Sequence, residues 1–479
     1  MTGSLRERLL KGLAANTAGQ AANLLIQILS VPLFLFFWGA ELYGEWLILF
    51  AMPAYLALSE LGFATTAMHR MAMLVSQDKR DEALAVFQTA WTMISVVSTV
   101  LLVLVAAAAL VMPIGEVFQL SRLGPTAVAM VLILLGLQFL ATLQTSVFYA
   151  GFYCEGRYGL GSIYQTAIRL FEFAALAAAV AAGLGPVGAA AGFLAGRLIG
   201  TVGMWRQLRQ SLPWLSIGYR YADWAMFREM LRPSLAFMGF PLGNALNIQG
   251  VVLVLGASLG PGAVVVFATL RTLTRVVIQL TNALSLSVRP EISRAYGADD
   301  FDLLGTIYRR LSQASTWIGF VSVVVLLFAG PPILILWTGA RILVEQPLFA
   351  LLLGVVLVNA WWWGSLSLLY ASNRHEGLSL AYIAANLMAI SLVMPLTGIL
   401  GNGGAALALL ISEIAIAVYT IWRANRLLGA PALAHAAASL RPPIYLIAQS
   451  RQVARELAAA AKGRLGLGPN SDTGRSENG

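Results

Sequence analysis

Long apolar runs follow one another along almost the whole chain, separated by short polar segments. At 1.5 Å per helical residue, a run of roughly 20 residues crosses a hydrocarbon core of about 30 Å. The runs are rich in Leu and Ala and lack the alternation of barrel strands. They predict an all-α integral membrane protein with twelve spans, at 14–38, 44–68, 84–112, 125–150, 159–182, 186–208, 233–256, 263–288, 311–336, 347–371, 378–400 and 403–424.

The charges between the predicted spans fix an orientation. With a cytoplasmic N-terminus, 25 of the 31 Lys and Arg residues fall in cytoplasmic segments, and only Arg122 and Arg341 fall on the opposite side. Cytoplasmic loops of membrane proteins carry such an excess of positive charge. We therefore predict a multi-pass protein of the cell inner membrane with both termini in the cytoplasm. The net charge of +9 then reflects topology, and nucleic acid is not expected as a partner.

Composition argues against a soluble enzyme domain. Charged residues make up 11% of the chain, against about 25% in soluble proteins, and hydrophobic residues 59%. The three histidines lie far apart in loops or the tail, and no metal-ligand spacing, P-loop or GxSxG motif occurs. The single cysteine, Cys154, is expected to fill space. No enzymatic activity, metal or cofactor is predicted.

The two halves of the chain resemble each other. Gly39 pairs with Gly256 at an offset of 217, and Asp78 with Asp299 at an offset of 221. An even number of spans per half gives both halves the same orientation, so the pattern predicts two six-helix lobes related by a parallel pseudo-repeat. The expected segments are an N-terminal lobe at 1–208, an interfacial linker helix at 209–232, a C-terminal lobe at 233–425, and a cytoplasmic amphipathic and disordered tail at 426–479. Substrate sites of such transporters lie between the lobes.

A polar stripe follows one face of the first span. Its members are spaced by 4, 3, 4 and 3 residues, so they share that face: Asn16, Gln20, Asn23, Gln27 and Ser30. The repeat gives Asn244 as the partner of Gln27, and Asn247 as that of Ser30. The stripe is expected to line a wet cavity; the alternative is hydrogen bonding between helices.

Arginines inside the spans are the sharpest chemical signal. The eighth span presents Arg271, Arg275, Gln279 and Asn282 on one face, and each arginine would cost about 2.5–3.5 kcal/mol at the centre of a bilayer. Guanidinium groups bind phosphate through two parallel hydrogen bonds, which favours an anionic ligand. Arg169 and Arg197 are further candidates. Arg169 could instead pair with Glu172 on its own helix, and Arg197 with a glutamate on a neighbour.

Three carboxylates inside the spans, Glu60, Glu172 and Glu413, could couple transport to protons or cations. They could equally neutralise the arginines. The consecutive tryptophans at 361–363 could stack on sugars, but they point in three directions, which favours packing.

The stretch at 16–70 carries a resemblance. Its features are Asn16-Thr17, Val31-Pro32-Leu33, Gly39, Tyr43-Gly44, Trp46 and Leu61-Gly62 before Arg70, together with Arg271, Pro290 and Glu291 in the second half. This pattern resembles polysaccharide flippases of the Wzx type, in the multidrug/oligosaccharidyl-lipid/polysaccharide (MOP) exporter superfamily. The resemblance covers about residues 10–425.

The resemblance implies transport of undecaprenyl-diphosphate-linked oligosaccharide from the cytoplasmic to the periplasmic leaflet, for surface polysaccharides such as lipopolysaccharide or exopolysaccharide. The expected partners are this substrate and membrane lipids, and a polysaccharide polymerase with its chain-length machinery is a candidate. The alternative within the superfamily is a cation-coupled multidrug exporter, which would want an acidic or apolar cavity. Membrane glycosyltransferases and polymerases usually need a large loop, which this sequence lacks, and a non-transporting scaffold would not need polar stripes.

Overall fold

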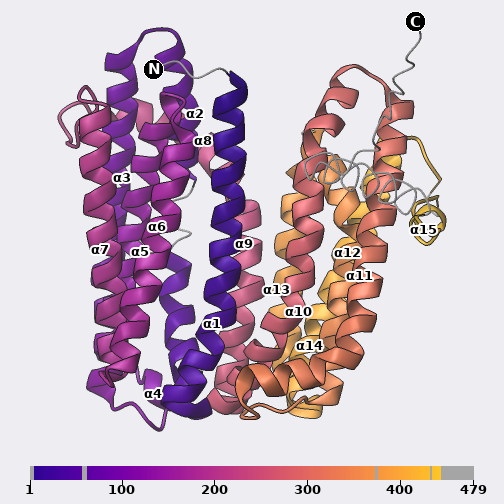
Figure 1. The fold of residues 1–479 in the computed structure, drawn as a ribbon. Helices are drawn as coiled ribbons and strands as arrows, with labels where there is room; N and C mark the ends of the chain where they lie inside the picture. The colour runs from indigo at the N-terminus through magenta and orange to yellow at the C-terminus, as the bar shows by residue number, and fades with distance from the viewer. Residues whose placement is uncertain (1–4, 57–61, 373–375, 432–433, 444–479) are drawn as a thin grey trace, which may run out of the picture.

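The computed structural model describes residues 5–56, 62–372, 376–431 and 434–443, and within these ranges every regular element is a helix (Figure 1). The elements are α1 (Leu5–Ala54), α2 (Phe63–Ser76), α3 (Arg80–Val111), α4 (Ile114–Val117), α5 (Pro125–Cys154), α6 (Tyr158–Ala181), α7 (Gly185–Ser211), α8 (Trp224–Phe237), α9 (Gly239–Ala245), the π-helix η2 (Leu246–Gly250), α10 (Val251–Gly297), α11 (Phe301–Thr338), α12 (Gln346–Ala371), α13 (Glu376–Leu400), α14 (Asn402–Leu427) and α15 (Ala434–Ser439).

Two glycine breaks reconcile these helices with twelve spans. Ten helices of the described chain are long and apolar enough to cross a membrane, and two of them each contain two spans. Gly39 divides α1 with φ 71° and ψ −179°, and Gly260 divides the α9–α10 segment with φ 81° and ψ 179°. Residues other than glycine rarely adopt this combination of φ and ψ. The twelve-span, all-α prediction is confirmed.

The same glycines expose the internal repeat. Three pairs of positions with positive φ share an offset of 221: Gly39 with Gly260, Asp78 with Asp299, and Gln119 with Ala340. The pairing of Asp78 with Asp299 was predicted. The pairing of Gly39 with Gly256 is wrong, because Gly256 lies inside a regular helix against Ile48. Asn244 and Asn247 were assigned to Gln27 and Ser30 with the same offset of 217, so these two assignments are also wrong.

Several helices differ from the predicted spans at their ends. The second span, predicted at 44–68, is completed by α2 beyond residues 57–61, which lie outside the described residues. The seventh begins with α9 at Gly239, after α8 has ended at Phe237, rather than at 233. The ninth begins ten residues early, at Phe301, where the Asp300 side chain accepts a hydrogen bond from the Leu303 amide. Hydropathy does not detect polar helical turns that extend beyond the bilayer.

The two bundles separate at one end and meet at the other (Figure 1). At the end that carries α4, buried side chains from both halves, such as Phe34, Val131, Phe267 and Phe349, form one continuous apolar core. At the end that carries the α2–α3 and α10–α11 turns, each bundle has a core of its own. We call these the joined end and the open end.

Helices α1 and α10 cross closely at the joined end. An added Cβ on Gly44 would collide with the backbone carbonyl of Pro261, and one on Gly256 would lie 2.8 Å from the Ile48 side chain. Only hydrogen at these positions allows the backbones to approach so closely. The crossing closes the space between the lobes at this end.

Helix α11 and the loop that follows it add two hydrogen bonds to the backbone of α1. Pro32 has no N–H, so the Ile28 carbonyl loses its helical donor, and the Trp337 indole N–H donates to it instead at 2.7 Å. The Arg341 guanidinium donates to the carbonyl of Leu35, which lies one turn before the break at Gly39. Both bonds join the two lobes.

The linker between the lobes packs on the N-terminal bundle. Arg70 of α2 forms an ion pair of 2.8 Å with Glu229 of α8, and Phe63 stacks on Phe227 with ring centres 5.2 Å apart. Helix α8 begins at Trp224, later than the predicted linker. The division of the chain into four segments stays a prediction.

Replacing Gly39 with alanine is expected to destabilise the fold by about 1–3 kcal/mol. No atom lies within 4 Å of the added methyl group, so the cost comes from backbone strain alone. Thermal unfolding of the detergent-solubilised protein measures the effect. Gly262→Ala is the matched control, because Gly262 has equal space and an ordinary φ. Equal melting temperatures for the two variants would contradict the strain argument.

Candidate functional site

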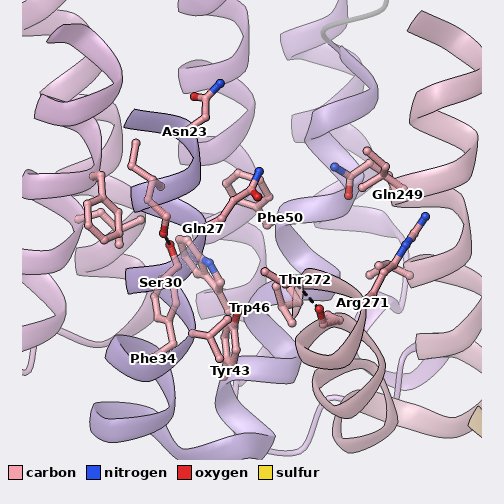
Figure 2. Close-up of a pocket in the computed structure, with 18 of the residues that line it drawn as sticks. Asn23, Gln27, Ser30, Phe34, Tyr43, Trp46, Phe50, Gln249, Arg271 and Thr272 are labelled. Atoms are coloured by element: carbon pink, nitrogen blue, oxygen red, sulfur yellow. Dashed lines mark hydrogen bonds between the residues drawn. The ribbon is translucent and has the colours of Figure 1, made fainter. Parts of the chain in front are cut away.

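A cavity of about 480 Å³ lies between the two lobes. Its walls come from α1, α6 and α7 on one side and from η2 and α10 on the other. In Figure 2, Asn23, Gln27 and Ser30 of α1 lie on one wall, opposite Gln249 and Arg271. The cavity therefore sits where the repeat predicts a substrate site.

The α1 wall presents the predicted polar stripe. Asn23, Gln27 and Ser30 all line the cavity. The Asn23 carbonyl oxygen accepts a hydrogen bond of 2.7 Å from the Arg169 guanidinium, so Arg169 also reaches the cavity from α6. Gln20 is exposed and lies outside this lining, and the side chain of Asn16 is outside the described set.

Two arginines of α10 line the cavity and differ in their hydrogen bonding. Arg271 donates to the Asn247 backbone carbonyl at 3.0 Å and to its side-chain oxygen at 2.5 Å. It also lies over the Phe267 ring at 5.6 Å. Arg275 lines the same cavity, and among the described residues it makes no hydrogen bond or ion pair. Arg275 is thus a cation available to a ligand.

Polar residues connect the walls and support them from behind. Gln279 donates to Gln27 at 2.9 Å, which links the lobes on the open side of the arginines. Asn247 does not line the cavity; it holds Arg271 and donates to Asn386 at 2.7 Å. Asn244 and Asn282 lie outside the lining, so the structure does not bring these two candidates to the cavity.

Arg197 forms a buried ion pair with Glu172. Its guanidinium donates to the two carboxylate oxygens at 2.6 and 2.8 Å, and Gln138 donates to the same carboxylate at 2.5 Å. Glu172 borders the cavity, whereas Arg197 lies behind it. Arg197 therefore pairs with a glutamate on a neighbouring helix, which was one of the predicted alternatives. Glu172 pairs with Arg197 rather than with Arg169 on its own helix.

Glu413 is buried in the C-terminal lobe, where it accepts hydrogen bonds from Asn359 at 2.6 Å and from Trp362 at 2.8 Å. It does not line the cavity. Trp361 donates to Ser439 at 3.0 Å, so the tryptophans at 361–363 pack within the protein, as favoured. Glu60 lies outside the described residues.

The aromatic end of the cavity was not predicted. Phe34 contacts both Tyr43, at 5.0 Å between ring centres, and Trp46, at 5.8 Å, next to the break at Gly39. Figure 2 places these rings beyond Ser30, toward the joined end. In the sequence, this cluster is indicated by the many aromatic residues at 34–50. The bend of α1 at Gly39 is what brings the two halves of that segment together. Gln249 was also missed.

Comparison with protein families identifies the chain. The sequence model of the family described as polysaccharide biosynthesis protein matches residues 56–343. The chain belongs to this family. The match includes the α6, α7 and α10 walls of the cavity. Among curated protein sequences, no match is found.

Solved structures with the same fold are transporters and flippases. A multidrug resistance MATE family transporter of the MOP superfamily, in an inward-facing conformation, matches with a TM-score of 0.72 and 13% identity, over 86% of this chain and 94% of its own. The lipid II flippase MurJ, in an inward closed conformation, matches with a TM-score of 0.68 and 14% identity, over 90% of both chains.

A MOP superfamily transporter from Pyrococcus furiosus, described as having a binding pocket of reverse polarity, matches with a TM-score of 0.56 and 15% identity, over 89% of this chain and 94% of its own. Identities this low establish the fold alone. The chain is thus a multi-pass membrane protein of the polysaccharide biosynthesis family, and its fold resembles that of MOP-superfamily transporters and of a lipid flippase.

Proposed function

We propose that the protein moves undecaprenyl-diphosphate-linked oligosaccharide from the cytoplasmic to the periplasmic leaflet of the inner membrane by alternating access, and that it is not an enzyme. The observation that carries the proposal is the cationic and polar cavity between the lobes. Arg271 and Arg275 supply bidentate donors for the diphosphate, and Asn23, Gln27 and Gln249 supply amides for sugars. The lipid chain stays outside this polar cavity.

The distribution of charge supports the direction of transport. The helix ends and turns at the open end are basic: Lys79 and Arg80 lie where α3 begins, Arg294 near the end of α10, and Arg309 and Arg310 in the first part of α11. Arg122 and Arg341 lie in the loops at the joined end. The open end therefore faces the cytoplasm, where the substrate is made. The aromatic segment and the crossing of α1 with α10 close the cavity toward the periplasm.

Charge also separates this function from multidrug export. Cationic drugs favour carboxylates, but the one carboxylate that lines the cavity, among the described residues, is Glu172, and Arg197 neutralises it. Arg275 lines the cavity without a hydrogen bond or ion pair among the described residues, and a central arginine costs about 2.5–3.5 kcal/mol. An anionic ligand would recover that cost.

Reconstitution in vesicles tests the proposal directly. We expect vesicles with the protein to flip a fluorescent undecaprenyl-diphosphate oligosaccharide at least ten times faster than empty vesicles, as measured by loss of fluorescence after an impermeant quencher is added. A variant with alanine at both 271 and 275 should match empty vesicles. Transport of a cationic dye without movement of the glycolipid would overturn the proposal in favour of multidrug export.

A further inference from the structure

A second hollow of about 580 Å³ lies on the outer side of α1, between the lobes. Helices α1 and α6 form one wall, and the end of α11 forms the other. The lining is apolar except near Arg341; it includes Leu29, Pro32, Phe37, Phe173, Ala177 and Trp337. We call this hollow the seam groove.

Helix α1 separates the seam groove from the central cavity. Gln27, Ser30 and Phe34 face the cavity, while Leu29 and Pro32 face the groove, so one helix presents a polar face inward and an apolar face outward. Phe173 of α6 lines both spaces. The two spaces are therefore neighbours that share one aromatic side chain.

The groove faces the hydrocarbon region rather than water. Leu29 is 44% exposed and Phe36 is 68% exposed, and both lie in the apolar run of the first span. Such side chains are in contact with lipid in a membrane. An apolar groove at this depth suits a hydrocarbon chain, whereas the arginines of the cavity suit the phosphates attached to it.

We propose that the seam groove holds the polyprenyl chain of the transported glycolipid while its diphosphate occupies the cavity, with Phe173 at the point where the chain passes from one space to the other. The inference rests on the proposed function and adds a path for the lipid. Burial of a CH₂ group is strongly favourable only when the group leaves water. Transfer from bilayer to groove gains far less, so the groove guides the chain more than it tightens binding.

Filling the groove tests the inference. Ala177→Trp places an indole in the groove at a position that does not itself line the cavity, and Leu170→Trp, on the same helix, is the control because Leu170 is exposed outside both spaces. With the full-length protein in nanodiscs, we expect Ala177→Trp to weaken binding of polyprenyl diphosphate at least fivefold and to leave inorganic pyrophosphate binding within twofold. Leu170→Trp should change neither.

Photocrosslinking gives a second readout that does not require filling the groove. A benzophenone at Phe37 should label polyprenyl diphosphate, and excess pyrophosphate should suppress that labelling, because it displaces the headgroup from the cavity. The same probe at Phe171, an exposed residue outside the groove, should show no such suppression.

The outcomes separate the two proposals. Two results would overturn the proposed role of the seam groove and leave the headgroup site in the cavity unaffected. One is equal binding of polyprenyl diphosphate by the wild type and a folded Ala177→Trp variant. The other is labelling at Phe37 that pyrophosphate does not affect. Suppression by phosphatidylglycerol at the same mole fraction would make the groove an ordinary phospholipid site and would also overturn it. Failure of the wild type to bind either diphosphate would remove the proposed function and the groove together.

Discussion

Replacement of Arg275 by alanine is expected to reduce surface polysaccharide export at least tenfold and to leave the protein as stable as the wild type or more so. Hydrogen bonds to charged groups contribute about 1.5–3 kcal/mol each, and 1.4 kcal/mol is a factor of ten in affinity. Within the described chain Arg275 has no hydrogen-bonding partner, so its removal breaks no internal bond and relieves the burial of a charge. Export assays and thermal unfolding measure the two effects.

Arg271→Ala should reduce export similarly but also lower stability, because it leaves the Asn247 oxygens without their donor. Lysine at either position should give intermediate export, since it keeps the charge and loses the fork of donors. Arg294→Ala on the same helix is the control, because Arg294 is exposed and pairs with Glu291. Normal export by the alanine variants at normal protein levels would remove both arginines from the site.

Replacement of Arg197 by methionine is expected to destabilise the protein by about 3–5 kcal/mol, because it leaves the Glu172 carboxylate buried without its cation. The double variant Arg197→Met with Glu172→Gln should recover most of this loss, since a neutral amide needs no counter-charge and can still pair with Gln138. Thermal unfolding of the two single variants and the double variant gives the coupling between the residues.

The same double variant decides the role of Arg197. If Arg197 serves only to neutralise Glu172, the double variant exports polysaccharide at close to the wild-type rate. If it exports poorly although its melting temperature is restored, the ion pair takes part in transport, as a coupling carboxylate or as a ligand. The two results distinguish structural from functional roles at one pair of positions.

Much of the architecture could be predicted because a bilayer restricts the choices. Apolar runs must be helices, and Arg122 and Arg341 alone on one side orient them. The site was partly predictable for the same reason: Asn23, Gln27 and Arg275 are costly in lipid, so they must face a cavity or a partner.

What could not be predicted depends on contacts between distant helices. Nothing near Arg197 in the sequence identifies Glu172 as its partner, 25 residues away on a neighbouring helix. The glycine pairing of the repeat failed because one glycine looks like another in sequence; the positive φ angle identifies Gly260, at the same offset of 221 as Asp78 and Asp299, as the partner of Gly39. Phe34 and Trp46 meet because the chain turns at Gly39, a feature of backbone geometry that hydropathy does not record.

The two hydrogen bonds that Trp337 and Arg341 donate to the backbone of α1 imply unequal tolerance to mutation across this interface. Ile28 and Leu35 accept through main-chain oxygens, so many other residues could stand at these positions and keep the contact. Trp337 and Arg341 donate through their side chains and have few substitutes. Pro32 belongs with the intolerant group although it makes neither bond, because any other residue would restore an amide that competes for the Ile28 oxygen. A deep mutational scan should therefore find sequence drift on one side of this interface and constraint on the other.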